Sequence, residues 1–435
     1  MLKKRDLYLK RLIDFQDTEL VKVITGIRRC GKSSLLKLMV EHLKESGIAQ
    51  DQILEMNFES MQFYRMDAEQ LYQYVKEKSN DRKKNYLFFD EIQMIPNWQR
   101  TINALRVDFD CDIYITGSNA FLLSSELSTY LSGRYVEIKM LPLSFSEFID
   151  FYGYVLKERH LPDGTVRKRL YDSNEEDYEI QDIFALYVKY GGMPVLAETG
   201  LDQEKAATIL DGIYSAVVMR DILEREHQKG ERGIADAGLL RKIVMFLADN
   251  IGNNTSVTTI SNVLVNEGLL DQRNRKGKPG AQTIQAYIEA LVNAYIFYDI
   301  KRFDIKGKDY LRTLGKYYIV DMGIRNYLLG FRDGDTGHII ENIVYFELLR
   351  RGYSVAIGKI GQQEIDFIAT KTNEKIYFQV TESMTEESTR NREMAPLLKV
   401  KDNYPKQIIT ANTGLLQTID GIEIVNLYDF LLAAY

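Results

Sequence analysis

The chain has 435 residues, which is more than a single hydrophobic core usually serves and predicts about three domains. Its 45% hydrophobic and 27% charged residues are typical of a soluble globular protein, and no stretch approaches the roughly 20 apolar residues of a membrane span. Two cysteines, four histidines and the lack of an apolar leader favour a cytoplasmic protein without a disulfide framework. With a net charge of −6, any nucleic-acid contact must come from a local basic patch.

Residues 20–150 alternate short β-rich runs with longer helical patterns. This alternation is typical of a parallel sheet whose strands are joined by crossover helices. The expected strands cover residues 21–25, 52–57, 86–90, 112–116 and 135–139.

The segment from Gly26 to Ser33 fits the pattern G-x-x-x-x-G-K-[ST] between an expected strand and an expected helix. In this pattern, backbone N–H groups surround phosphate oxygens, the lysine neutralises them and the serine hydroxyl binds Mg²⁺. The alternative is a glycine-rich turn without a ligand. ATP and Mg²⁺ are therefore the expected cofactors, with Ser33 as a metal ligand. The candidate binding residues are Gly26, Ile27, Arg28, Arg29, Cys30, Gly31, Lys32, Ser33 and Ser34.

Two further strands are expected to end in polar residues. Asp90 and Glu91 follow an apolar run, and this pair suits a carboxylate that holds the Mg²⁺ shell next to one that orients water. Asn119 follows the run 112–116, where its amide suits contact with the attacking water or the γ-phosphate. Solvated acids and a helix cap are the respective alternatives.

These motifs, together with the stretches 131–138 and 141–148, resemble a widespread prokaryotic family of AAA+ ATPases that carry a nuclease-like C-terminal domain. The resemblance implies that Asp90 and Glu91 form the Walker B pair and that Asn119 is sensor 1. It also makes Arg134 a candidate arginine finger, acting on its own site or on that of a neighbour in an oligomer. A surface or ion-paired arginine is the alternative.

From about residue 144 to residue 226 the pattern becomes helical and predicts a lid. Within it, Gly191 to Pro194 resembles the Gly-x-Pro element with which signalling ATPases of the STAND group place a proline against adenine. A helix stop is the alternative for Pro194. A polar stretch at residues 226–233 is the expected linker, so the core and lid are assigned to residues 1–230.

Residues 231–330 show three helical patterns followed by two β-like runs, which predicts a winged helix. Basic residues precede the third helix and follow it, and their charge favours DNA binding, although many winged helices contact proteins instead. The basic residues are Arg273, Arg275, Lys276, Lys278, Lys301, Arg302, Lys306, Lys308 and Arg312.

Residues 331–435 return to an α/β pattern that resembles the PD-(D/E)xK nuclease fold. Glu341 lies in an expected helix, and Asp366 and Gln379 lie in consecutive expected strands. The position expected to hold a lysine is Thr381, and Gln379 replaces the common glutamate. A nuclease needs both the metal ligands and the lysine, so a degenerate site is favoured over an active one.

The sequence therefore predicts an α/β protein with a P-loop AAA+ core and helical lid, a winged helix, and a restriction-endonuclease-like domain. The leading hypothesis is an ATP-driven switch that engages DNA or a protein partner. An ATP-regulated nuclease and a nucleotide-binding scaffold without turnover are the alternatives. Oligomerisation is compatible with all three, and a membrane partner is not expected.

Overall fold

The structure is a computed structural model that describes residues 3–80, 82–120, 131–160, 166–224, 236–266, 280–307, 309–332, 334–412 and 417–434. The chain forms two compact units. The first comprises Met1–Pro142 and Asn293–Tyr295, and the second comprises Leu143–Val292 and Ile296–Tyr435.

The first unit is built on a five-stranded sheet in the order β2-β3-β4-β1-β5. Every neighbouring pair in it is parallel, which confirms the predicted parallel sheet. All five residues of β1 are buried, as expected for a strand covered on both faces. The strands are β1 (Val21–Thr25), β2 (Ile53–Asn57), β3 (Asn85–Asp90), β4 (Cys111–Gly117) and β5 (Tyr135–Lys139).

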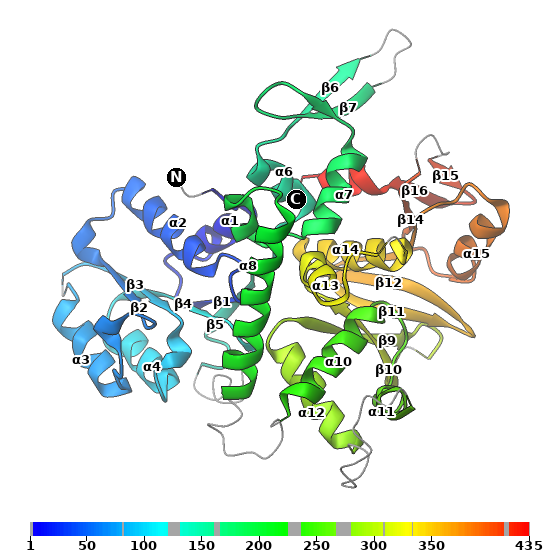
Figure 1. The fold of residues 1–435 in the computed structure, drawn as a ribbon. Helices are drawn as coiled ribbons and strands as arrows, with labels where there is room; N and C mark the ends of the chain where they lie inside the picture. The colour runs from blue at the N-terminus through cyan, green and yellow to red at the C-terminus, as the bar shows by residue number, and fades with distance from the viewer. Residues whose placement is uncertain are drawn as a thin grey trace. The chain divides into compact units, whose positions relative to one another are not determined.

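Helices cover both faces of this sheet. The helix α1 packs on α2, and α3 packs on α4, and Figure 1 shows the two pairs on opposite sides of the sheet. Between strands and helices lie the short turns η1 (Gln50–Gln52), η2 (Met61–Phe63) and η3 (Ile92–Met94). The helices are α1 (Asp6–Asp14), α2 (Lys32–Glu45), α3 (Ala68–Lys78) and α4 (Trp98–Asp108).

The second unit contains an eight-stranded mixed sheet in the order β10-β9-β11-β12-β13-β14-β16-β15. The pairs β9·β11, β13·β14 and β14·β16 are parallel, and the others are antiparallel. Its strands are β9 (Phe297–Asp304), β10 (Asp309–Ile319), β11 (Ser354–Ile360), β12 (Gln363–Lys371), β13 (Glu374–Thr381), β14 (Lys406–Thr410), β15 (Thr418–Ile419) and β16 (Ile422–Asn426).

Two helices cover the middle of this sheet. The helix α14 packs against β10 to β13, and α15 packs against β12 to β14. The other helical segments are α6 (Phe145–Tyr152), α7 (Ile180–Tyr190), η5 (Pro194–Glu198), α8 (Gln203–Ala216), the π-helix η6 (Val217–Glu224), α10 (Ala237–Asp249), α11 (Val257–Asn266), α12 (Ala281–Asn293), α13 (Met322–Leu329), α14 (Thr336–Arg350), α15 (Glu387–Leu398) and α16 (Leu427–Leu432).

The region predicted as a wholly helical lid also contains strands. The antiparallel strands β6 (Val155–His160), β7 (Val166–Tyr171) and β8 (Asp177–Tyr178) lie between α6 and α7. Every residue of β6 is exposed, so no alternation of apolar and polar residues marks it as a strand. The helical expectation was therefore wrong for these residues.

The predicted winged-helix segment has the expected order of elements, α10, α11, α12 and the hairpin β9–β10. However, β9 also pairs with β11, so one sheet crosses the predicted boundary at residues 330 and 331. Hydrophobic periodicity identifies a strand but not its distant partner, which explains the difference. Whether this segment works as a winged helix stays a prediction. The expected linker at residues 226–233 lies outside the described residues.

Candidate functional site

The phosphate loop connects β1 to α2 through two glycines with positive φ. Gly26 has a φ of 142°, and a Cβ there would lie 2.1 Å from the Met140 carbonyl oxygen. Gly31, with a φ of 104°, is the N-cap of α2, whose first turn carries no acidic residue. The positive end of the helix dipole is therefore not compensated within the helix, which suits a phosphate ligand.

Lys32 is buried at the start of α2, with 4% of its surface exposed. Its ammonium donates to the carbonyl oxygens of Gly26 at 3.0 Å and Ile27 at 3.2 Å. These carbonyls belong to the loop itself and carry no net charge, so they hold the cation in the loop without neutralising it. A site with this lysine and the free helix end fits a polyphosphate anion.

Asp90, at the end of β3, is held by the two neighbouring strands. Its Oδ1 accepts a 2.6 Å hydrogen bond from the Thr116 hydroxyl of β4, and its Oδ2 accepts a 3.0 Å bond from the Asn57 amide of β2. Each carboxylate oxygen has two lone pairs, so both can still bind a metal ion. The sequence analysis did not include Asn57 or Thr116. Their positions at the carboxyl ends of adjacent strands are the signal that could have found them.

Glu91 adopts a left-handed conformation with a φ of 56°. Its backbone N–H donates to the Thr116 hydroxyl at 2.9 Å, so that one hydroxyl orients both acids of the pair. The Glu91 side chain accepts hydrogen bonds from Ser118 at 3.4 Å and from Gln93. A non-glycine residue in this region costs about 1–3 kcal/mol and occurs preferentially at functional sites.

The remaining predicted residues of the loop differ in their surroundings. Arg28 forms an ion pair of 2.5 Å with Glu59, and Arg29 has a φ of 63°. Ile27 and Cys30 are buried, and burial raises the pKa of the Cys30 thiol. Ser33 and Ser34 are exposed in the first turn of α2, and Asn119 is buried just beyond β4.

The buried side chain of Arg5 binds the backbone of the phosphate loop. The Arg5 guanidinium donates to the carbonyl oxygens of Cys30 at 3.0 Å, Leu141 at 2.9 Å and Pro142 at 3.3 Å. Because Leu141 and Pro142 follow β5, this side chain joins three separate segments of the unit. Arg5 was not predicted, and no motif in the sequence marks it.

Arg134 is exposed at the opposite end of the sheet from the phosphate loop. Its carbonyl oxygen accepts a 2.9 Å hydrogen bond from the N–H of Val21, the first residue of β1, whereas the loop follows the last residue. Four steps along the strand are about 13 Å, which is beyond the reach of one arginine side chain. This position favours the intermolecular form of the finger hypothesis over the intramolecular form. Both forms stay predictions.

Pro194 belongs to the second unit, where it begins η5 after a tightly packed pair of glycines. A Cβ on Gly191 would lie 2.3 Å from Asp321 Oδ1, and one on Gly192 would lie 2.5 Å from the Leu143 carbonyl oxygen. The Gly192 N–H donates to Asp321 Oδ2 at 2.6 Å. Close packing alone therefore explains why glycine occupies positions 191 and 192. The contact of Pro194 with adenine stays a prediction.

The three residues of the predicted nuclease-like site line one pocket of about 630 Å³ in the second unit. Glu341 comes from α14, Asp366 from β12 and Gln379 from β13, and the Gln379 Oε1 accepts a 3.4 Å hydrogen bond from the Asp366 N–H. Burial and the Glu341 carboxylate raise the pKa of Asp366 well above its ordinary value. Lys316 of β10, which was not predicted, lies against Glu341 at 2.9 Å.

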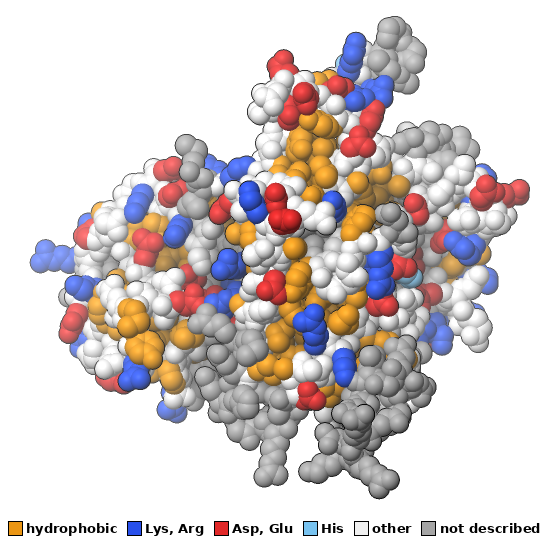
Figure 2. Space-filling view, viewed as in Figure 1, with side chains coloured by type: hydrophobic (Ala, Val, Ile, Leu, Met, Phe, Trp, Pro, Cys, Tyr) orange, Lys and Arg blue, Asp and Glu red, His pale blue; other side chains and the backbone are white. Residues whose placement is uncertain are grey.

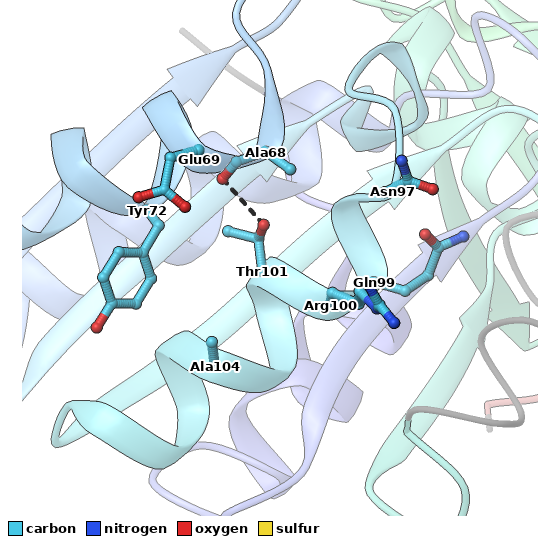
Figure 3. Close-up of a pocket in the computed structure, with 8 residues that line it drawn as sticks. All are labelled: Ala68, Glu69, Tyr72, Asn97, Gln99, Arg100, Thr101 and Ala104. Atoms are coloured by element: carbon cyan, nitrogen blue, oxygen red, sulfur yellow. Dashed lines mark hydrogen bonds between the residues drawn. The ribbon is translucent and has the colours of Figure 1, made fainter.

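A second pocket, of about 550 Å³, lies in the first unit where α3 and α4 begin (Figure 3). Its lining includes Glu69, Tyr72 and Arg100, and Thr101 bridges the two helices through a 3.0 Å hydrogen bond to the Ala68 carbonyl oxygen. The lining contains none of the predicted site residues, so this pocket is separate from the phosphate loop.

The predicted DNA-contacting residues can be placed only in part. Lys301 and Lys306 are exposed, whereas Arg273, Arg275, Lys276, Lys278 and Lys308 lie outside the described residues, as does the side chain of Arg312. On the face shown in Figure 2, positive and negative side chains are interspersed. Among the described residues, no helix is both long and apolar enough to cross a membrane.

Comparison with known families agrees with the site in the first unit. A family profile described as "AAA domain" matches residues 18–149, which contain the phosphate loop, the acidic pair and all five strands of the sheet. A profile described as "Domain of unknown function (DUF8612)" matches residues 181–335. The first unit is thus a P-loop domain of the AAA+ ATPase class.

The chain as a whole is 42% identical over 430 residues to an uncharacterized protein of Haemophilus influenzae, covering 98% of each chain. It belongs to the family of that protein. An uncharacterized protein of Methanocaldococcus jannaschii is 29% identical over 403 residues, covering 90% of this chain and 82% of the other. The solved structure of the Aeropyrum pernix ORC1 protein in complex with DNA matches at 12% identity with a TM-score of 0.32, covering 75% of this chain and 92% of the other.

Proposed function

We propose that the protein is a Mg²⁺-dependent ATPase that works as a switch, in which ATP binding and hydrolysis in the first unit control the engagement of DNA or a protein partner by the second. One observation carries the ATPase part. The Thr116 hydroxyl holds both Asp90 and Glu91 at the edge of the sheet that also bears the phosphate loop. A merely solvated acidic pair would not need this support.

Different residues would bind the phosphates, hold Mg²⁺ and orient the attacking water. Lys32 and the N–H groups at the start of α2 would bind the phosphates, and Ser33 and Asp90 would hold Mg²⁺. Bound Mg²⁺ would neutralise negative charge on the phosphate oxygens. Glu91, oriented by Ser118 and Gln93, would hold the attacking water in line with the γ-phosphate.

Two substitutions separate binding from hydrolysis. Lys32→Ala should lower ATP affinity at least tenfold, because the phosphates lose a buried cation. Glu91→Gln should keep ATP affinity within about twofold while phosphate release falls on the order of 100-fold, because an amide cannot accept the proton of the water. Calorimetry with ATP and a phosphate-release assay measure the two effects.

The surface change Glu77→Gln on α3 is the matched control and should alter neither quantity. Full turnover by Glu91→Gln would show that the catalytic assignment is wrong. For the partner, pull-down from cells with Glu91→Gln held in its ATP-bound state would distinguish DNA from protein. Recovery of neither would contradict the switch.

A further inference from the structure

The resemblance of the C-terminal region to metal-dependent nucleases implies a divalent cation at Glu341 and Asp366. The residues present do not fit such an ion. Lys316 of β10 is buried, with 4% of its surface exposed, and its ammonium lies 2.9 Å from Glu341 Oε1 and 2.6 Å from Glu364 Oε1. A cation therefore already lies between two carboxylates of the pocket.

Further donors contact carboxylate oxygen atoms of this pocket. The Tyr318 hydroxyl donates to Glu341 Oε1 at 2.5 Å, and the Val380 N–H donates to Asp366 Oδ2 at 2.8 Å. The Gln379 amide donates to Glu393 Oε2 at 3.0 Å. Among the described residues, no group of three or more acids, histidines or cysteines has the arrangement needed to hold a metal ion.

We propose that the Lys316 ammonium replaces the divalent metal ion in this pocket, so that the pocket carries its own cation and has no metal-dependent nuclease activity. A metal ion bound to Glu341 would lie close to the ammonium, and their repulsion at a buried site is strong. Although burial alone would lower it, the carboxylates of Glu341, Asp366 and Glu364 raise the pKa of Lys316 above its ordinary value.

The position of Lys316 distinguishes this role from that of a catalytic lysine. A catalytic lysine must present free donors to the phosphate that is cleaved, whereas the Lys316 ammonium is directed to Glu341, an expected metal ligand, and to Glu364. These carboxylates belong to α14 and β12, and Lys316 belongs to β10. The ion cluster therefore joins three elements of the second unit, so Lys316 also stabilises the fold of this unit.

Mn²⁺ binding tests the proposal. The Lys32→Ala background removes the contribution of the nucleotide site, and electron paramagnetic resonance reports free Mn²⁺. We expect no Mn²⁺ site in the Lys32→Ala protein at millimolar concentration. Adding Lys316→Met should lower the melting temperature and create a Mn²⁺ site whose dissociation constant is at least tenfold below the millimolar range, because the substitution leaves buried carboxylates without a cation. Mn²⁺ should then restore part of the lost stability.

Two further variants control this experiment. Lys316→Arg retains the positive charge and should not gain a Mn²⁺ site, and Asp366→Asn added to Lys316→Met should abolish the gained site. Mn²⁺ binding or Mn²⁺-dependent plasmid cleavage by the protein with Lys316 intact, lost on Asp366→Asn, would overturn the proposal. If Lys316→Met does not fold, this comparison of intact Lys316 protein with Asp366→Asn decides alone.

Discussion

Gly26 is the residue on which the shape of the phosphate loop depends most directly. Its φ of 142° is unfavourable for any other residue, and a Cβ would approach the Met140 backbone oxygen to 2.1 Å. Backbone cannot move away as a flexible side chain can, so the loop and the end of β5 would have to separate.

Gly26→Ala should therefore lower the free energy of unfolding of the first unit by more than about 2 kcal/mol. Gly47→Ala is the matched control, because Gly47 also has a positive φ, 90°, but a Cβ there meets nothing within 4 Å. It should cost only about 1 kcal/mol. Trp98, the single tryptophan, is buried in this unit, so its fluorescence in urea measures the unfolding. Equal costs for the two variants would refute the clash.

At this scale, the sequence predicts the residues that belong to a continuous motif. The phosphate loop and the acidic pair were identified because their chemistry requires a fixed local spacing. Asn57, Thr116 and Lys316 were missed because each acts on a residue at least 25 positions away along the chain. Such partners become visible only when the order of the strands is known.

At the scale of elements, α7 and α13 are joined by polar contacts in both directions. Asp321, the N-cap of α13, accepts the Gly192 N–H that follows α7, and the Asn326 amide donates to the carbonyl oxygens of Val188 and Lys189. A Cβ on Gly323 would lie 2.1 Å from the Tyr190 carbonyl oxygen, so the helices meet without space for a side chain. Asp321 is thereby fully enclosed.

Burial raises the pKa of Asp321 to about 6 from an ordinary value of 3.8, despite N–H donors from Gly192, Ile324 and Gly323. The folded protein thus prefers the protonated acid. Its ionisation costs stability as the pH rises through about 6, and this cost is absent below about 4. Asp321→Asn removes the titration, so wild type should gain roughly 1 kcal/mol relative to the variant between pH 7.5 and pH 5.0.

Circular dichroism melts of the two proteins at both pH values measure this difference. Asp202→Asn is the control, because Asp202 caps α8 in the same way but is exposed. Its difference from wild type should change little with pH. A constant difference between wild type and Asp321→Asn would contradict the proposed titration.

Regular elements of the first unit were predictable because burial on both faces produces continuous apolar runs bounded by turns. The strand β6 was not, since all of its residues are exposed. The pairing of β9 with β11 was also not predictable, because a strand's periodicity is the same whichever neighbour it has.

At the scale of the whole molecule, Arg134 connects activity to assembly. It lies at the end of β1 remote from the phosphate loop, so we expect it to contact the nucleotide of a second copy. Arg134→Ala should keep ATP affinity within about twofold while lowering hydrolysis on the order of 100-fold or more, because an arginine finger acts mainly on the transition state.

A mixing experiment measures this dependence. Arg134→Ala supplies an intact acidic pair and Glu91→Gln supplies an intact arginine, so phosphate release should partly recover when the two inactive proteins are combined. The activity of each variant alone at the same total concentration is the control. Unchanged hydrolysis by Arg134→Ala would instead leave Arg134 as a surface residue.

The pairing of β9 with both β10 and β11 also has a consequence for synthesis of the chain. The hairpin β9–β10 is made before residues 320–353 and β11, so it leaves the ribosome before β11 does. At ordinary elongation rates, the edge of β9 that pairs with β11 then stays unpaired for several seconds. An unpaired strand edge can form hydrogen bonds with another chain, so the nascent protein is prone to aggregation during this interval. We therefore expect its synthesis to depend on chaperones that keep neighbouring chains apart.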